Sequence, residues 1–275
     1  MKFWLFWLTL VLFHSASGQE SGRWPSPLSS IEVKNLDLIA IDSRDQIFIS
    51  STTGDIFLYQ STGVQSNLFS PPRQGRLQQL EASWTVNIFS FSADLQSYRI
   101  LDRFLNPLVE KDFLTYGITL PRAATLGNNN VIWVYDEADL SLKSLNYSQG
   151  ELIQSQPLNL ILSPEQLAVQ EIKEYKNRVF LRVKDSGIFL FDNQANFIQS
   201  LPVSGKGRLC FYRENLLWIH ENSLQIFSLT TQETFTLGPL PQAEIQSIQI
   251  GQKVVVLASQ DRLWIYPLPE FLKTF

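Results

Sequence analysis

Residues 38–63 read LIAIDSRDQIFISSTTGDIFLYQSTG, three apolar runs separated by two short polar segments. The runs are three or four residues long and rich in isoleucine and phenylalanine, which favour β-strands. Asp45 and Gly54 lie between the runs, and both residue types tolerate tight turns. The stretch therefore predicts three consecutive antiparallel strands joined by hairpins.

The same unit recurs along the chain. The central runs lie at residues 47, 88, 132, 179, 217 and 255, so successive units are 38 to 47 residues apart, and a second run follows each by 7 to 10 residues. A weaker run follows five of these pairs, and a further run precedes every pair, at residues 38–41, 77–80, 123–126, 167–169, 209–211 and 245–250. About 40 residues per four strands is typical of propeller blades. The sequence predicts an all-β, six-bladed β-propeller with four-stranded antiparallel blades.

A propeller ring has to complete its last sheet, because an unpaired edge promotes association. Only residues 268–275 follow the last pair, whereas the strand-like run Ile31–Lys34 precedes the first unit. We expect this N-terminal run to be added to the last blade as its outermost strand. Bulky side chains recur at one repeat position, which predicts packing between blades and not a ligand-stacking groove; they are at residues 48, 89, 133, 180 and 218.

The N-terminal segment has the pattern of a signal peptide. Lys2 is followed by the apolar run Phe3–Phe13 and by the small residues Ala16, Ser17 and Gly18. This run is about half the length that a bilayer-spanning helix requires, which favours cleavage over an uncleaved anchor. We predict a signal peptide at residues 1–18, a propeller domain at residues 19–275, no transmembrane segment after cleavage, and export to the periplasm or the extracellular space.

The composition argues against several function classes. The 275 residues include 22 Lys and Arg against 26 Asp and Glu, a net charge of −4, which argues against nucleic-acid binding. After the predicted cleavage the chain retains one histidine, His220, and one cysteine, Cys210. An intramolecular disulfide is then impossible, and a zinc site built from Cys and His is excluded. We expect no cofactor.

Residues 38–50 and 54–63 resemble an NHL-type propeller repeat, and Gly187–Asn193 matches its second half. The chain also resembles a group of exported bacterial propellers with no assigned activity, in which a segment like Leu101–Leu105 recurs in the second unit. The resemblance implies a ring of binding surfaces without a single common chemistry. The chain departs from the NHL pattern in the first turn, where glycine is usual but Asp45, Asn130, Asn177 or Asn215 stands here.

Nucleophilic catalysis has weak candidates. His220 lies at the end of a predicted strand, and no Gly-x-Ser-x-Gly motif accompanies it. Cys210 lies between Leu209 and Phe211, and an apolar setting raises the pKa of a thiol and makes it unreactive.

A metal-dependent hydrolase of the lactonase or phosphoesterase type is the alternative enzyme hypothesis. Carboxylates in the turns between the middle strands could hold a hard cation at the channel mouth. The candidates are Asp136, Glu137, Asp139, Asp185 and Asp261. Turn aspartates more often cap the backbone.

Three arginines form a candidate anion site. Arg76, Arg122 and Arg208 stand just before the predicted inner strands of units two, three and five. If those strands line the channel, the guanidinium groups could surround one mouth and bind an anion through forked hydrogen bonds. Solvated turn residues are the alternative interpretation.

The sequence favours an exported, non-catalytic propeller that binds or scaffolds a partner in the cell envelope. The expected partner is another envelope protein or a small anionic ligand, and not a nucleic acid. The metal-dependent hydrolase stays open, as does a structural subunit of a larger envelope assembly.

Overall fold

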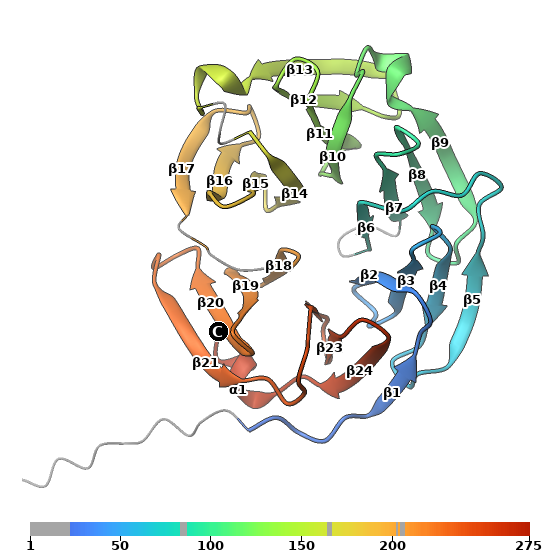
Figure 1. Cartoon of the computed structure of the whole chain (residues 1–275), viewed down its shortest axis with the longest axis vertical. Coiled ribbons are helices and arrows are strands. Elements are labelled where there is room, and N and C mark those ends of the chain that lie inside the picture. Colours follow the sequence, from blue (N-terminus) through green and yellow to red (C-terminus); the bar gives the residue numbers. More distant parts are fainter. Residues whose placement is uncertain (1–22, 83–86, 164–166, 202, 204–206) are drawn as a thin grey trace, which may run out of the picture.

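The computed structural model describes residues 23–82, 87–163, 167–201, 203 and 207–275, and the predicted signal peptide at residues 1–18 lies outside them. Six four-stranded antiparallel sheets are arranged as blades around a central axis (Figure 1), which confirms the predicted all-β, six-bladed propeller. The described helices are short: η1 (Phe113–Tyr116), η2 (Leu158–Leu160) and α1 (Glu270–Lys273). None of them is long and apolar enough to span a bilayer.

In five blades the strands run from the axis to the rim in chain order. Blade 1 consists of β2 (Leu36–Ile41), β3 (Ile47–Ser51), β4 (Ile56–Tyr59) and β5 (Gln65–Phe69). Blade 2 consists of β6 (Gln79–Glu81), β7 (Asn87–Ser92), β8 (Ser97–Asp102) and β9 (Pro107–Asp112). Blade 3 consists of β10 (Pro121–Leu126), β11 (Val131–Asp136), β12 (Ser141–Asn146) and β13 (Glu151–Pro157). Blade 4 consists of β14 (Val169–Tyr175), β15 (Arg178–Val183), β16 (Gly187–Asp192) and β17 (Phe197–Leu201). Blade 5 consists of β18 (Cys210–Tyr212), β19 (Asn215–His220), β20 (Ser223–Ser228) and β21 (Thr234–Pro239).

Blade 6 combines both ends of the described chain (Figure 1). Its inner three strands are β22 (Ser247–Ile250), β23 (Val254–Ala258) and β24 (Arg262–Pro267). Its outermost strand is β1 (Ser29–Glu32), which pairs antiparallel with β24, with Ser29 opposite Ile265 and Glu32 opposite Arg262. The pairing strand therefore begins and ends two residues earlier than the apolar run at residues 31–34.

Apolar side chains fill every interface between neighbouring blades. In the described part of the chain they form six clusters, one for each pair of adjacent blades. Alternate residues of one strand serve different interfaces: Ile47 and Ile49 pack toward blade 6, and Phe48 packs toward blade 2. This follows from the period of two in a strand, which sends successive side chains to opposite faces.

The bulky residues at the repeated position are buried, as predicted. Phe48, Phe89, Trp133 and Phe180 each pack toward the following blade. Trp218 is also buried, but it packs toward the preceding blade, whereas its neighbour Leu217 faces the following one. Trp218 is therefore one residue out of step with the other four positions.

The Leu101–Leu105 segment forms the turn between two outer strands. The Asp102 carboxylate accepts hydrogen bonds from the backbone N–H groups of Phe104 and Asn106, both at 2.8 Å. Leu105 adopts a left-handed backbone conformation with φ of 67°. Asp192 makes the equivalent bonds in blade 4, so in both blades an aspartate stabilises the outer hairpin turn.

The inner strand of blade 4 lies further along the chain than the sequence pattern predicts. The apolar run at residues 167–169 suggested its position, but the strand is β14, Val169–Tyr175. This prediction was wrong because β14 carries the charged residues Glu171, Lys173 and Glu174, and Glu171 and Glu174 are buried. Glu171 accepts a hydrogen bond from the backbone of Leu209, which precedes blade 5, and the Glu174 backbone donates one to Thr125 of blade 3, and an apolar pattern does not detect such a strand.

Candidate functional site

Two of the three candidate arginines lie at exposed ion pairs. Arg76 donates two hydrogen bonds to the Asp37 carboxylate, at 2.9 and 2.8 Å, and its side chain is 60% exposed. Arg122 pairs with Glu137 at 2.7 Å, and its side chain is 51% exposed. Each guanidinium thus has its own carboxylate, and the described contacts give these two arginines no partner in common with Arg208.

Arg208 is placed differently, because its side chain reaches into the central channel. Its Nη1 donates a hydrogen bond to Gln79 Oε1 at 3.3 Å and lies 4.0 Å from Glu171 Oε1. Gln79 belongs to blade 2, which lies opposite blade 5 in the ring (Figure 1). The side chain is 29% exposed. The structure therefore places one of the three predicted arginines at the axis.

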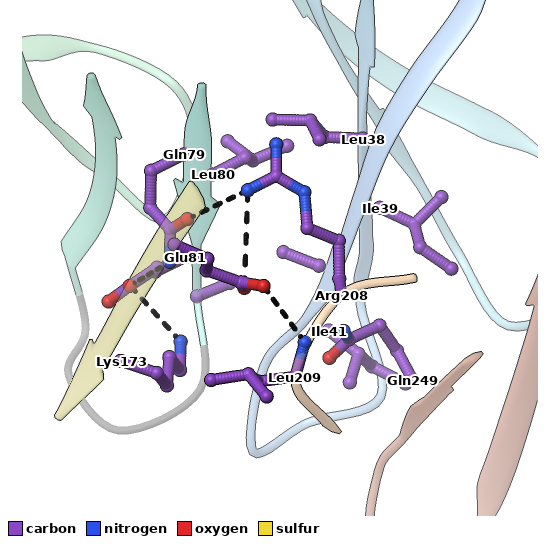
Figure 2. A pocket seen from close by; sticks show the side chains of 13 residues that line it. Leu38, Ile39, Ile41, Gln79, Leu80, Glu81, Lys173, Arg208, Leu209 and Gln249 are labelled. Atoms are coloured by element: carbon purple, nitrogen blue, oxygen red, sulfur yellow. Dashed lines mark hydrogen bonds and ion pairs between the residues drawn. The ribbon is translucent and has the colours of Figure 1, made fainter. Parts of the chain in front are cut away.

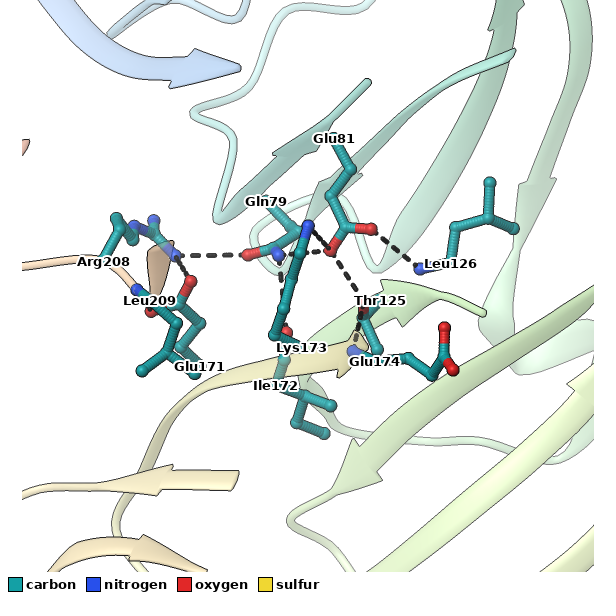
Figure 3. A network of polar contacts seen from close by, with 10 residues as sticks. All are labelled: Gln79, Glu81, Thr125, Leu126, Glu171, Ile172, Lys173, Glu174, Arg208 and Leu209. Atoms are coloured by element: carbon teal, nitrogen blue, oxygen red, sulfur yellow. Dashed lines mark hydrogen bonds and ion pairs between the residues drawn. The ribbon is translucent and has the colours of Figure 1, made fainter. Parts of the chain in front are cut away.

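Glu81, on β6, is the centre of a polar network across the channel (Figure 3). Its Oε1 accepts hydrogen bonds from Thr125 Oγ1 at 2.7 Å and from the Gln79 amide, and it lies 3.3 Å from Lys173 Nζ. Its Oε2 accepts a bond from the backbone N–H of Leu126 at 3.3 Å. One buried carboxylate thereby joins blades 2, 3 and 4.

The other half of the network surrounds Glu171, on β14. Its Oε2 accepts a hydrogen bond from the backbone N–H of Leu209 at 3.1 Å and lies 3.5 Å from Arg182 Nε. Burial lowers the pKa of Arg182, and the nearby Arg208 charge lowers it further, although Glu171 opposes both effects. We call Gln79, Glu81, Thr125, Glu171, Lys173 and Arg208 the central network; with Leu126 and Leu209 it ties blades 2 to 5 together.

Glu174 lies beside this network on the blade 3 side of β14. Its backbone N–H donates to Thr125 Oγ1 at 3.2 Å, and its carboxylate accepts a bond from the backbone N–H of Asn177 at 2.7 Å. Burial raises the pKa of Glu174, and the Glu81 charge adds to that effect. The shift therefore comes from the enclosed setting and the like charge nearby.

A small cavity of about 30 Å³ opens beside the central network, which is room for one or two waters (Figure 2). Arg208, Lys173, Glu171 and Gln79 form its polar wall, and the backbone and side chains of residues 38–41 form much of the opposite wall. Blades 2 to 5 thus fill their side of the channel with bonded side chains, and the remaining space faces β2.

Two of the aspartates in the metal hypothesis belong to a structural ion pair. Asp136 is buried, and it accepts hydrogen bonds from Lys143 Nζ at 2.7 Å and from the backbone N–H groups of Thr119, Leu120 and Ala138. Burial alone would raise the pKa of Asp136, but these donors outweigh it and hold the pKa below its usual value. Asp139 contacts the same Lys143 nitrogen at 2.7 Å. A lysine thus occupies the position between the two carboxylates.

Of the other three candidates, Glu137 pairs with Arg122, and Asp185 and Asp261 lie apart on exposed turns. Asp185 has a left-handed backbone with φ of 56°, and the backbone carbonyl of Asp261 accepts a hydrogen bond from Val33. Among the described residues, no group of three or more His, Cys, Asp or Glu is placed to hold a metal ion. The structure therefore offers no support for the hydrolase alternative.

The single histidine and the single cysteine of the predicted mature chain differ in their exposure to solvent. His220 ends β19 with a largely exposed side chain, and its Nε2 lies 3.9 Å from Glu221. Cys210 is buried between blades 5 and 6, and burial raises the pKa of its thiol to about 12. An exposed imidazole and a buried thiol of this kind do not form a nucleophile and base pair.

Native protein is expected to resist thiol labelling at Cys210. Burial raises the pKa of the thiol from 9.0 to about 12, and each unit lowers the thiolate fraction about tenfold at pH 8. Labelling should therefore be at least ~1000-fold slower in the folded than in the urea-unfolded protein. Iodoacetamide labelling followed by mass spectrometry measures both rates. A native rate equal to that of the unfolded chain would contradict the buried position.

The outer strands form an apolar rim. Large apolar side chains on them are more than a third exposed: Leu68 on β5, Leu108 on β9, Leu152 and Ile153 on β13, Phe197 and Ile198 on β17, and Phe235 on β21. Each of these strands pairs with a bulge or register shift, which discourages the addition of another strand. We call these seven residues the apolar rim; they are spread over blades 1 to 5 and leave apolar surface exposed to solvent.

The sequence analysis identified Arg208 but not the rest of the central network. Glu81, Glu171 and Lys173 lie in inner strands, next to apolar residues such as Leu80 and Ile172. The available signal was a charged residue beside an apolar one just after the predicted inner runs at residues 77–80 and 167–169. Only the ring shows that these residues from different repeats meet.

Comparison with known proteins identifies the fold. No protein-family model matches the chain, and no curated protein matches it. The structure is similar to the Pan2 WD40 domain of Neurospora crassa, with a TM-score of 0.59 and 12% identity over 87% of this chain and 80% of that chain. It is also similar to PorZ of Porphyromonas gingivalis, described as an essential bacterial surface component of the type-IX secretion system, with a TM-score of 0.57 and 14% identity over 87% of this chain. The match spans 32% of the PorZ chain. At these identities the likeness shows the fold alone, that of a β-propeller.

Proposed function

We propose that this chain is an exported, non-catalytic β-propeller that binds or scaffolds another protein in the cell envelope. We also propose that its repeats are of the NHL type, from the pattern at residues 38–63 and 187–193. The observation that carries the binding role is the apolar rim. The PorZ likeness supports an envelope setting, because that protein is a surface component of a secretion system.

Two neighbouring blades, 3 and 4, each carry two residues of the apolar rim. Leu152 and Ile153 on β13 and Phe197 and Ile198 on β17 are 41% to 54% exposed. A partner that covers these side chains removes apolar surface from water, which is the main favourable term in protein association. The bulged edges favour contact through side chains over strand addition.

Export can be tested on the protein isolated from the cells that make it. We expect the envelope or secreted fraction to contain a chain that begins at Gln19, as N-terminal sequencing would show. A chain that keeps residues 1–18 and stays in the cytoplasm would contradict the proposal.

Partner binding is tested by crosslinking in the envelope. We expect the double variant Ile153→Lys and Ile198→Lys to recover a crosslinked partner at least about tenfold less well than the wild type, because charge at the centre of an apolar contact is costly. Thr234→Lys, on the exposed outer strand β21, is the matched control and should leave recovery unchanged. Equal recovery in both variants would show that the contact does not involve blades 3 and 4. The absence of any crosslinked protein would contradict a scaffold role.

A further inference from the structure

We infer that the cavity beside Arg208 binds a small monovalent anion, a short-chain carboxylate or a halide. The inference rests on the proposed binding role and names a ligand class for it. Arg208 lines this cavity from the segment that leads into blade 5, together with residues of β2 and β6 (Figure 2). Its test uses purified protein without any partner, so it can fail while the proposed function stands.

The charges around the cavity leave one cation without a close partner. Glu81 lies 3.3 Å from Lys173, and Glu171 lies 3.5 Å from Arg182. Arg208 shares Glu171 with Arg182, at the longer distance of 4.0 Å. Each carboxylate thus has a nearer cation than Arg208, and the positive charge of Arg208 is the one that remains unmatched at the cavity.

The hydrogen-bonding groups show the same excess of donors. The oxygens of Glu81 already accept bonds from Thr125, Gln79 and Leu126, and Glu171 Oε2 accepts one from Leu209. A guanidinium carries five N–H groups, and the described hydrogen bonds of Arg208 use Nη1 alone. A ligand with acceptors only, which is an anion, fits a site with spare donors.

Glu174 does not supply the missing negative charge. It lies on the blade 3 side of β14, where its carboxylate accepts a bond from Asn177, and the charges that act on it are those of Glu81 and Lys173. The unmatched charge at Arg208 therefore does not depend on Glu174.

The size and walls of the cavity define the ligand class. A volume of about 30 Å³ excludes sugars, nucleotides and peptides. Leu38 and Ile39 also line the cavity, where they can contact the short alkyl part of a carboxylate. Acetate would place its oxygens on the guanidinium and its methyl group against these side chains, chloride would occupy the polar end alone, and propionate is the longer homologue that tests the size limit.

The test measures the melting temperature against increasing sodium acetate, propionate or chloride. Ionic strength is held constant with a bulky sulfonate buffer salt that the cavity cannot admit. A ligand that binds only the folded state raises the melting temperature as its concentration passes its dissociation constant. An increase in melting temperature with acetate, whether or not propionate has the same effect, identifies a carboxylate site. An increase with chloride alone identifies a halide site. No rise with any of the three overturns the inference.

Variants locate the site. Arg208→Gln should raise the ligand concentration needed for the increase in melting temperature at least about tenfold, because hydrogen bonds to a charged ligand are lost. Arg122→Gln is the matched control, since Arg122 is an exposed arginine paired with Glu137, and it should behave as the wild type. Equal weakening in both variants overturns the assignment to Arg208. If Arg208→Gln does not fold, saturation-transfer NMR on wild-type protein decides: transfer to the acetate methyl supports the carboxylate site, and its absence contradicts it.

Discussion

Glu81→Ala is expected to lower the free energy of unfolding by about 3–5 kcal/mol, the range for removing one partner of a buried ion pair. The substitution leaves Lys173 without its close carboxylate and leaves Thr125, Gln79 and the Leu126 N–H group without their acceptor. Thermal denaturation followed by circular dichroism should show a melting temperature lower by roughly 10 °C for a chain of this size.

Glu137→Ala is the matched control for Glu81→Ala. Glu137 also pairs with a cation, Arg122, but at the exposed surface, where an ion pair contributes at most about 1 kcal/mol. Glu81→Gln separates charge from shape, since the amide keeps the size of the side chain and can still accept hydrogen bonds. If Glu81→Ala costs no more than Glu137→Ala, the central network does not hold the blades together.

Phe180→Ala is expected to lower the free energy of unfolding by about 3–5 kcal/mol, because it leaves a cavity in a closely packed interface. Phe180 is fully buried in the cluster between blades 4 and 5, where its ring lies 4.6 Å from that of Phe211 between centroids. Urea denaturation gives the difference from the shift of the midpoint.

The control for Phe180→Ala is Phe104→Ala. The Phe104 ring lies on a hairpin turn and is 59% exposed, and the backbone N–H that bonds Asp102 is kept in alanine. Its removal should change the stability by no more than about 0.5 kcal/mol. Comparable losses in the two variants would argue against interfaces between blades as the main source of stability.

The strands were predictable because the same apolar pattern recurs in each of the six units. Apolar runs 38 to 47 residues apart located the middle strands, and the equivalent positions at Phe48, Phe89, Trp133 and Phe180 are buried as predicted. Two predictions were wrong, the position of one inner strand and the orientation of one bulky residue. The inner strand β14 was placed too early because Glu171 and Lys173 interrupt its apolar pattern. Trp218 faces the preceding blade because a shift of one residue turns a side chain to the other face.

The candidate site was predictable only in fragments. Arg76, Arg122 and Arg208 look alike in sequence, since each stands just before an inner strand. The structure separates them: Asp37 and Glu137 bind the first two at the surface, and Arg208 reaches Gln79 across the channel. Their partners lie 39, 15 and 129 residues away in the chain, so no local pattern distinguishes them.

By itself the sequence determined six repeated sheets, because strand periodicity and turn residues act over a few neighbouring positions. The tertiary structure alone decided what occupies the axis. Glu81, Lys173, Glu171 and Arg208 come from three different repeats, and the closed ring brings Glu81 to Lys173 and Arg208 to Gln79 and Glu171. Burial of a charge is costly without a partner, and that partner is set by how the blades close, which the local pattern of any one blade does not contain.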